Sequence, residues 1–379
     1  MSIFFIIIIF LIVLSVLVFA HELGHFWVAR RFGVNAEEFG FGFPPRILGI
    51  YKSTSGRWKI ARYGKKVEDA ADTIYSVNLI PLGGFVKIKG EDGGDEEAED
   101  SFANKKIWKR ALILSAGVIM NVILAMFLFG LGFMIGLPQG IDDSIPEDRV
   151  RDKHVQIAQV HPDSPADRAG LEMGDGVLSI QGQEFSQASE LEEFIKSREG
   201  QELNYQIQRG REVLSKEITP VELEETGDVG VGIYINTVGL VKHPWYVAIW
   251  EGIKTAIVLT GAIIVALGIL LKNLVVGAPV GGEVGGPVMI ASLTGQFAEM
   301  GFVYLLQFTA LLSINLAIIN FLPIPALDGG RVIFLIVEKI KGSPVRKEVE
   351  AVIHNIGFLL LIFLIILVTF GDISSLIRD

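Results

Sequence analysis

Two histidines and a glutamate with the spacing of a zinc site follow an apolar segment near the start of the chain. They are His21, Glu22 and His25, directly after the apolar run at residues 2–20. Helix positions i and i+4 share one face, so both imidazoles can reach one metal ion. Glu22 would then lie beside the metal as general base toward a water molecule. Ionisable groups at membrane depth are costly and usually functional, which favours this reading over a chance match.

A catalytic zinc site usually has a third protein ligand. The chain contains no cysteine, so this ligand must be a histidine, an aspartate or a glutamate. The best candidate is Asp328, which ends the apolar run at residues 302–327 just after two helix-breaking prolines. Asp-Gly-Gly would also suit a turn outside the bilayer, but its pairing with the histidine motif favours a ligand. The other histidines lie in no cluster typical of a metal site: His154, His161, His243 and His354.

The two motifs together resemble those of the site-2 intramembrane metalloproteases, and most closely the bacterial regulator-of-sigma-E protease type. They are His-Glu-Leu-Gly-His at residues 21–25 and Asn-Phe-Leu-Pro-Ile-Pro-Ala-Leu-Asp-Gly-Gly at residues 320–330. The resemblance extends over nearly the whole chain. One departure is Val118, where the family commonly has proline. Weaker similarities lie in the segments at residues 39–45 and 81–86 and in Ala116, Gly117 and Asn121.

The resemblance implies a protease in which His21, His25 and Asp328 hold Zn²⁺ and a water occupies the open position. Asn320 matches the asparagine of the family motif, and its amide is a candidate catalytic donor to the oxyanion. Asn315, five residues earlier, is a candidate for substrate binding. For both asparagines the alternative is an interhelical hydrogen bond that only stabilises the helix bundle. The implied substrates are single-pass transmembrane proteins, such as anti-sigma factors or signal-peptide remnants.

A helical substrate poses a physical problem, because its carbonyl groups are hydrogen-bonded within the helix. It must unwind locally, and in lipid its freed backbone groups need partners. Residues 74–80 and 85–89 have strand-like composition, with Pro-Leu-Gly-Gly between them. We predict a membrane-associated β-hairpin here, which either binds the substrate or is an ordinary hairpin packed on the membrane surface. Its edge could pair with the unwound substrate at Gly83, Gly84, Phe85 and Val86.

Composition is typical of a membrane protein with one small soluble module. Half of the 379 residues are apolar and 20% are charged. A further apolar run, at residues 256–271, could span, lie re-entrant or rest at the interface. The resemblance implies four spans, and a fifth would give the two motif-bearing helices incompatible orientations. The four runs near spanning length are residues 2–20, 111–137, 302–327 and 356–370.

Lysine and arginine predict the orientation of the helices through the positive-inside rule. They concentrate at residues 30–66, 105–110 and 331–347, which all flank one side. This predicts a multi-pass protein of the bacterial cytoplasmic (inner) membrane, with both termini extracytoplasmic. The first run lacks the charged start and the cleavage site of a signal peptide. The net charge of −10 and the lack of a basic stripe argue against a nucleic-acid partner.

Residues 155–221 are predicted to form a small extracytoplasmic domain of strands and two helices. Ser-Pro-Ala at residues 164–166 and Gly-Leu-Glu-Met-Gly-Asp at residues 170–175 resemble a PDZ domain of the permuted bacterial kind. Such domains bind peptide termini by adding a strand to a sheet edge. The alternative is a steric gate, and the sequence leaves both open. Strands are predicted at residues 156–160, 176–180, 202–208 and 212–218, and helices at 165–169 and 188–196.

The predicted fold class is a polytopic α-helical membrane protein with about four transmembrane helices, a membrane-associated β-hairpin and an inserted α+β PDZ-like domain. A catalytically silent PDZ-containing scaffold is the main alternative function, but it would not need Glu22. A zinc transporter would need ionisable residues in several spans. The predicted parts are residues 1–137 and 301–379 as the membrane core, 138–222 as the PDZ-like domain, and 223–300 as an interfacial and glycine-rich segment.

Overall fold

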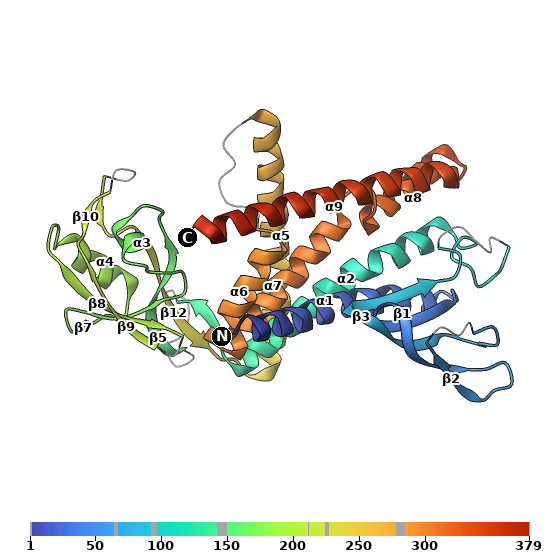
Figure 1. The fold of residues 1–379 in the computed structure, drawn as a ribbon, viewed down its shortest axis with the longest axis horizontal. Helices are drawn as coiled ribbons and strands as arrows, with labels where there is room; N and C mark the ends of the chain where they lie inside the picture. Colours follow the sequence, from blue (N-terminus) through green and yellow to red (C-terminus); the bar gives the residue numbers. More distant parts are fainter. Residues whose placement is uncertain are drawn as a thin grey trace. The chain divides into compact units, whose positions relative to one another are not determined.

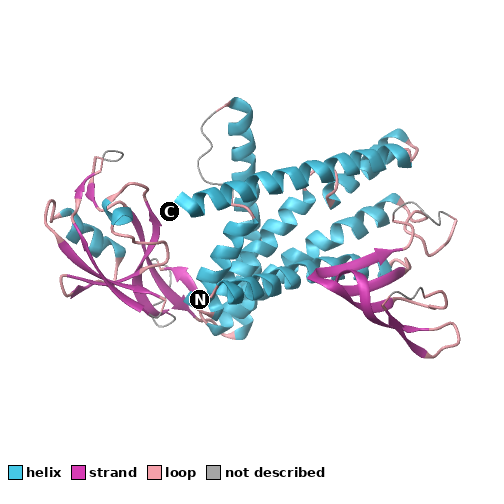
Figure 2. Cartoon of the chain, in the orientation of Figure 1, coloured by secondary structure: helices cyan, strands magenta, loops and turns pink. Residues whose placement is uncertain are grey.

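The computed structural model describes most of the chain as two compact units, whose helices and strands are labelled in Figure 1 and coloured by type in Figure 2. The first unit comprises Met1–Leu128, Ile253–Gly295 and Phe308–Asp379, and the second comprises Phe129–Gly252 and Gln296–Gln307. Part of the predicted interfacial and glycine-rich segment at residues 223–300 lies outside the described residues. Those described are 2–63, 67–91, 97–141, 150–210, 212–223, 227–277 and 285–378.

Long apolar helices form where the sequence has long apolar runs. In the described part of the chain, five helices are long and apolar enough to cross a membrane. One of them contains the run at residues 256–271, and few of its residues in the most apolar window are buried. Length and composition therefore allow one span more than the four predicted. The five are α1 (Ile3–Arg31), α2 (Ile107–Ile135), α5 (Trp245–Val276), α7 (Phe302–Phe321) and α9 (Lys347–Arg378).

An antiparallel sheet of β1 (Ala36–Lys52), β2 (Trp58–Arg62) and β3 (Ile74–Ile88) follows α1 in the first unit. Phe39 is opposite both Tyr75 and Val86, so the first half of β1 lies between the two halves of β3. The sequence predicted a hairpin in which these halves pair with each other. The structure has instead one continuous strand, β3, whose two halves pair with opposite sides of β1.

The course of β1 explains this difference. Two prolines, Pro44 and Pro45, interrupt its hydrogen-bonding ladder because proline has no N–H group. The second half of β1 then pairs with β3 again, with Leu48 opposite Val77. Val77 also lies opposite Phe41. The half of β3 at residues 84–88 pairs with β1 on one side and with no described strand on its other side.

The second unit contains an inserted domain, defined as Leu137–Val241. Its sheet has the order β4-β12-β5-β6-β8-β9, with β7 paired to β6. The domain was predicted to end at residue 222. Its sheet extends further, because β12 lies between β4 and β5. Its strands are β4 (Leu137–Gly140), β5 (Val150–Val160), β6 (Gly176–Ile180), β7 (Gln183–Glu184), β8 (Leu203–Arg209), β9 (Glu212–Ile218) and β12 (Ile233–Val241).

Two helices, α3 (Pro165–Arg168) and α4 (Ala188–Lys196), complete the inserted domain, together with a two-stranded sheet of β10 (Val221–Glu222) and β11 (Val229–Gly230). The six elements predicted within residues 155–221 are present, with ends that differ by a few residues at most except in β5. The core is formed by alternate residues of the strands with the apolar face of α4. Its fully buried members include Val155, Leu191, Tyr205 and Ile207.

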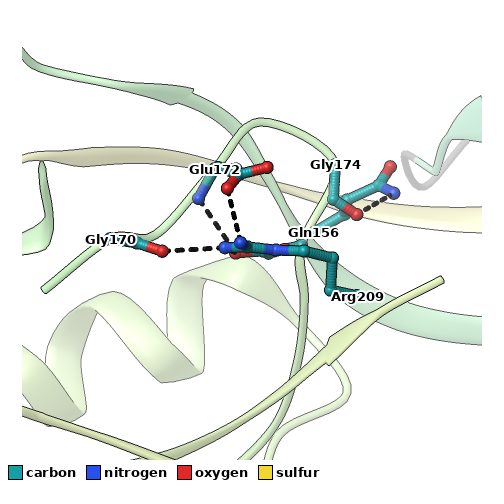
Figure 3. A network of polar contacts seen from close by, with 6 residues as sticks. Gln156, Gly170, Glu172, Gly174 and Arg209 are labelled. Carbon is teal, nitrogen blue, oxygen red and sulfur yellow. Dashed lines mark hydrogen bonds and ion pairs between the residues drawn. The ribbon is translucent and has the colours of Figure 1, made fainter. Parts of the chain in front are cut away.

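One polar network fixes the loop at residues 170–175 to the end of β8 (Figure 3). Arg209 donates to both carboxylate oxygens of Asp175 at 2.7 Å, and Asp175 is buried. Arg209 also donates to Glu172 at 2.5 Å and to the carbonyl of Gly170 at 2.8 Å. Gln156 donates to the Gly174 carbonyl at 2.9 Å. The Gly-Leu-Glu-Met-Gly-Asp motif is therefore accounted for by the structure of this loop.

Candidate metal centre

Two imidazoles of α1 lie close together in the first unit. The Nε2 atoms of His21 and His25 lie 3.1 Å apart, and both side chains are buried. Their positions follow from the helical period, which places residues i and i+4 on one face. The predicted convergence of the two histidines is thus present in the structure.

Asp328, the first residue of α8 (Asp328–Lys341), completes a cluster with the two histidines. Its Oδ2 atom lies 3.0 Å from Nε2 of His21 and 3.3 Å from Nε2 of His25. A tetrahedral zinc ion with bonds of about 2.0–2.1 Å would separate its ligand atoms by about 3.3 Å. Oδ2 is buried and receives no hydrogen bond of acceptable geometry from a described residue. The cluster therefore fits Zn²⁺ in donor type and spacing.

The turn before Asp328 is held by close backbone contacts. A Cβ atom on Gly329 or Gly330 would lie 2.3 Å from backbone carbonyl oxygens of the turn, so no side chain fits at either position. Ala326 has a φ of 77°, in the left-handed region that non-glycine residues rarely adopt. Its N–H group donates to Nδ1 of His354 on α9 at 2.9 Å. The helix α9 thus fixes the turn that presents Asp328.

Helix α2 supports the imidazoles from the other side. Nδ1 of His25 lies 2.8 Å from the carbonyl oxygen of Ile113, and Nδ1 of His21 lies 3.4 Å from the amide nitrogen of Asn121. A Cβ atom on Gly117 would lie 2.4 Å from Nε2 of His25. Gly117 and Asn121 resemble family positions, but the sequence alone indicates no role for either residue. The Ile113 contact uses a backbone group, so side-chain identity could not have indicated it.

Glu22 lies between the cluster and the edge of β3. A Cβ atom on Gly84 would be 3.2 Å from both Cβ and Cγ of Glu22. Ser15 of α1 donates to the carbonyl of Pro81 at 3.2 Å and accepts from the N–H of Gly83 at 3.3 Å. The edge formed by Gly83, Gly84, Phe85 and Val86 is thereby fixed to α1 close to the glutamate.

The two predicted asparagines of α7 are not in hydrogen-bond contact with the cluster. Asn315 donates to the carbonyl of Leu311 in its own helix at 3.1 Å. Asn320 is partly buried, and its side chain makes no hydrogen bond with a described residue. Roles for Asn315 and Asn320 remain predictions.

The fold and the site together fit one class: a peptidase whose candidate metal ligands come from the long apolar helix α1 and from the start of α8. The family model of peptidase family M50 matches residues 9–364. Zinc metalloprotease RasP of Geobacillus kaustophilus (strain HTA426) is 30% identical over 97% of this chain and 97% of its own length. Regulator of sigma-W protease RasP of Bacillus subtilis (strain 168) is 28% identical over 97% of this chain and 98% of its own length.

The chain belongs to peptidase family M50, the site-2 protease family. It is an intramembrane zinc metalloprotease of a bacterial membrane, as the resemblance implied. Among solved structures, the PDZ domain of the SdrC-like protein from Listeria monocytogenes is similar to part of the chain. The identity is 25%, the TM-score is 0.21, and the match covers 23% of this chain and 90% of that one.

Proposed function

We propose that the enzyme hydrolyses peptide bonds within or near the transmembrane helices of single-pass membrane proteins, with zinc held by His21, His25 and Asp328. One observation carries the ligand assignment: three ligand atoms from α1 and α8 lie within 3.3 Å of one another. Zinc in this position would activate a water molecule and polarise the scissile carbonyl group. The proposed substrates include anti-sigma factors, which fits the name of the Bacillus subtilis relative, a regulator of sigma-W protease, and also signal-peptide remnants.

Glu22 is the proposed general base. It accepts a proton from the attacking water and later passes this proton to the leaving amine. Asn320, whose carboxamide makes no hydrogen bond with a described residue, donates to the oxyanion in this scheme. A catalytically silent scaffold would have no use for Glu22 in this position.

The edge of β3 is the proposed site for the unwound substrate. Gly84, Phe85 and Val86 have no described partner strand on their outer side, so the outward-pointing N–H and C=O groups there can pair with a substrate strand. The contact between Gly84 and Glu22 would keep such a strand beside the general base. Backbone pairing would also satisfy the polar groups that unwinding exposes.

The proposed topology has four spanning helices, with both termini and the inserted domain outside the cytoplasm. The inserted domain contains a cavity of about 190 Å³. It is lined by α4, by the start of β12 and by residues 229–232. A peptide terminus could add to β12 in this cavity. The same domain could instead act as a size filter, and a domain deletion distinguishes the two.

The function can be tested in membranes with a single-pass test substrate. Mass spectrometry of the products should place the cut within or next to the apolar segment, and Glu22→Gln should give no products. Because the chain has no cysteine, Val86→Cys can be cross-linked to single cysteines in the substrate without background. Cross-links should form at Val86→Cys and not at Ile60→Cys on β2. Equal cross-linking at both positions would contradict substrate binding at the β3 edge.

A further inference from the structure

Asn121 is a fully buried polar residue in the apolar helix α2. Its amide nitrogen lies 3.4 Å from Nδ1 of His21, and its Oδ1 atom has no hydrogen-bond partner among the described residues. A buried carboxamide is costly unless it is hydrogen-bonded. The imidazole is the one polar side chain of the described residues that the carboxamide contacts, so the role of Asn121 must involve His21.

The chemistry of the imidazole decides which atom of Asn121 should face it. A neutral histidine that binds a metal through Nε2 carries its proton on Nδ1, and this N–H needs an acceptor. His25 satisfies the requirement, because its Nδ1 lies 2.8 Å from the carbonyl oxygen of Ile113. For His21 the group within reach is the carboxamide of Asn121. An amide nitrogen facing a protonated Nδ1 would place two donors against each other.

We propose that Asn121 is a positioning residue whose carboxamide oxygen accepts the hydrogen bond from Nδ1–H of His21 in the zinc-loaded enzyme. This bond keeps Nε2 of His21 directed at Asp328. The oxygen and nitrogen of a carboxamide have nearly the same size, so a half-turn about Cβ–Cγ exchanges them without displacing α2. Helix α2 then supplies one acceptor to each imidazole, a backbone carbonyl to His25 and a side chain to His21. The inference rests on the proposed zinc site.

Two substitutions separate an acceptor from a donor or a packing role. Asn121→Asp keeps the acceptor and removes the donor, and Asn121→Leu has a similar shape but neither. The purified full-length chain in detergent is stripped of metal, and its Zn²⁺ affinity is measured by competition with a chromophoric chelator. Asn121→Leu should weaken Zn²⁺ binding by about 10–100-fold, the usual effect of losing a partner of a ligating histidine. Asn121→Asp should bind Zn²⁺ as tightly as the wild type, and its Co²⁺-loaded form should keep the wild-type visible spectrum.

The outcomes distinguish this inference from the proposed function. A wild-type chain that binds no Zn²⁺ would overturn the zinc site itself. Wild-type binding of one Zn²⁺ per chain, with Asn121→Asp weakened as much as Asn121→Leu, would overturn only the role of Asn121. If Asn121→Leu does not fold, Asn121→Asp still tests the proposal, because a required amide donor predicts weaker Zn²⁺ binding in this variant and an acceptor predicts unchanged binding.

Ser313→Ala is the matched control. The hydroxyl of Ser313 donates to the backbone carbonyl of Asn121 at 2.7 Å, so its loss loosens the contact between α7 and α2 without touching the carboxamide. This variant should keep the wild-type Zn²⁺ affinity. A loss as large as that of Asn121→Leu would mean that packing of α2, and not the side-chain acceptor, supports His21.

Discussion

The carboxylate of Asp328 lies 3.0 Å from Nε2 of His21, although the two residues come from opposite ends of the chain. His21 is placed by the helical period of α1, whereas Asp328 depends on the turn between α7 and α8. The site is therefore complete only when both ends of the chain are folded together. A metal ion that binds the folded state and not the unfolded chain stabilises this arrangement by mass action.

Glu22→Gln should retain zinc and lose proteolysis. Glutamine has nearly the same shape as glutamate but cannot accept a proton from water, and general-base catalysis contributes about 10²–10⁴-fold to rates. Metal analysis should therefore give the wild-type zinc content. The rate of cleavage of a single-pass substrate should fall by at least about 10²-fold. Cleavage near the wild-type rate, with contaminating proteases excluded, would be incompatible with the proposed mechanism.

Asp328→Ala should lose both zinc and activity, because two histidines alone form a weak site. The loss of zinc affinity should exceed the about 10–100-fold expected for a residue that only supports a ligand. Asp372→Asn is a suitable control, since this buried carboxylate accepts from the N–H groups of Gly286 and Met289 and is not part of the metal cluster. It should lower thermal stability and keep zinc. Full zinc occupancy in Asp328→Ala would mean that the third ligand is a different residue.

His354 should affect zinc affinity through the backbone rather than as a ligand. It accepts a hydrogen bond from the N–H of Ala326, two residues before Asp328. His354→Leu removes this acceptor and should weaken zinc binding by about 10-fold, at the lower end of the effects of supporting residues. His354→Asn, whose Oδ1 can take the position of Nδ1, should restore it. Equal zinc affinity in the wild type and His354→Leu would show that the turn does not need this bond.

The proximity of His21, His25 and Asp328 could be predicted from the sequence because its signals are short-ranged or chemical. The spacing of His21 and His25 is a property of any helix, and Asp328 followed from the chemistry of zinc ligands and from membrane depth. The support given by α2 was not predictable in the same way, since the carbonyl of Ile113 carries no side-chain signal. The course of β3 was also missed, because strand pairing depends on distant partners and a strand-turn-strand pattern alone suggests a hairpin.

The ion pair between Glu38 and Arg46 should make stability depend on pH. Burial alone would raise the pKa of Glu38, but two hydrogen bonds from Arg46, at 2.9 and 2.5 Å, hold this pKa below its ordinary value of 4.5. A depressed folded-state pKa means that the unfolded chain binds the proton more tightly. The stabilisation is therefore complete above pH 4.5 and is lost as the pH falls through the folded-state pKa.

Glu38→Gln should test this prediction in chelator-treated protein, where zinc release does not interfere. At neutral pH it should lower the unfolding free energy by about 1.5–3 kcal/mol, the range for hydrogen bonds to charged groups. As the pH is lowered below 4.5, the midpoint temperature of thermal unfolding should also decrease less in Glu38→Gln than in the wild type. Glu37→Gln is the matched control, because Glu37 pairs with Lys87 at the surface, where such pairs contribute about 0–1 kcal/mol. Identical pH profiles for Glu38→Gln and the wild type would contradict the assignment.

The inserted domain should control access to the site rather than take part in the chemistry. None of its described residues belongs to the metal cluster, and in the proposed topology it lies across the membrane from the zinc ligands. Deleting only residues 155–221 would leave β12 without a sheet and expose an aggregation-prone edge. The deletion should instead remove Leu137–Val241 and rejoin the chain with about ten Gly/Ser residues, which span roughly 17 Å on average.

The deleted enzyme should cleave a substrate whose extracytoplasmic part has already been trimmed, at a rate close to that of the intact enzyme. It should also cleave some of the untrimmed substrate, which we expect the intact enzyme to exclude if the inserted domain is a size filter. Both substrates are compared in membranes, after zinc content and thermal unfolding show that the deleted enzyme is folded. If it is folded and zinc-loaded but cleaves neither substrate, a size filter cannot explain the domain. Capture of a peptide terminus between α4 and β12 would then be the better explanation, and point substitutions that fill this cavity should reproduce the loss.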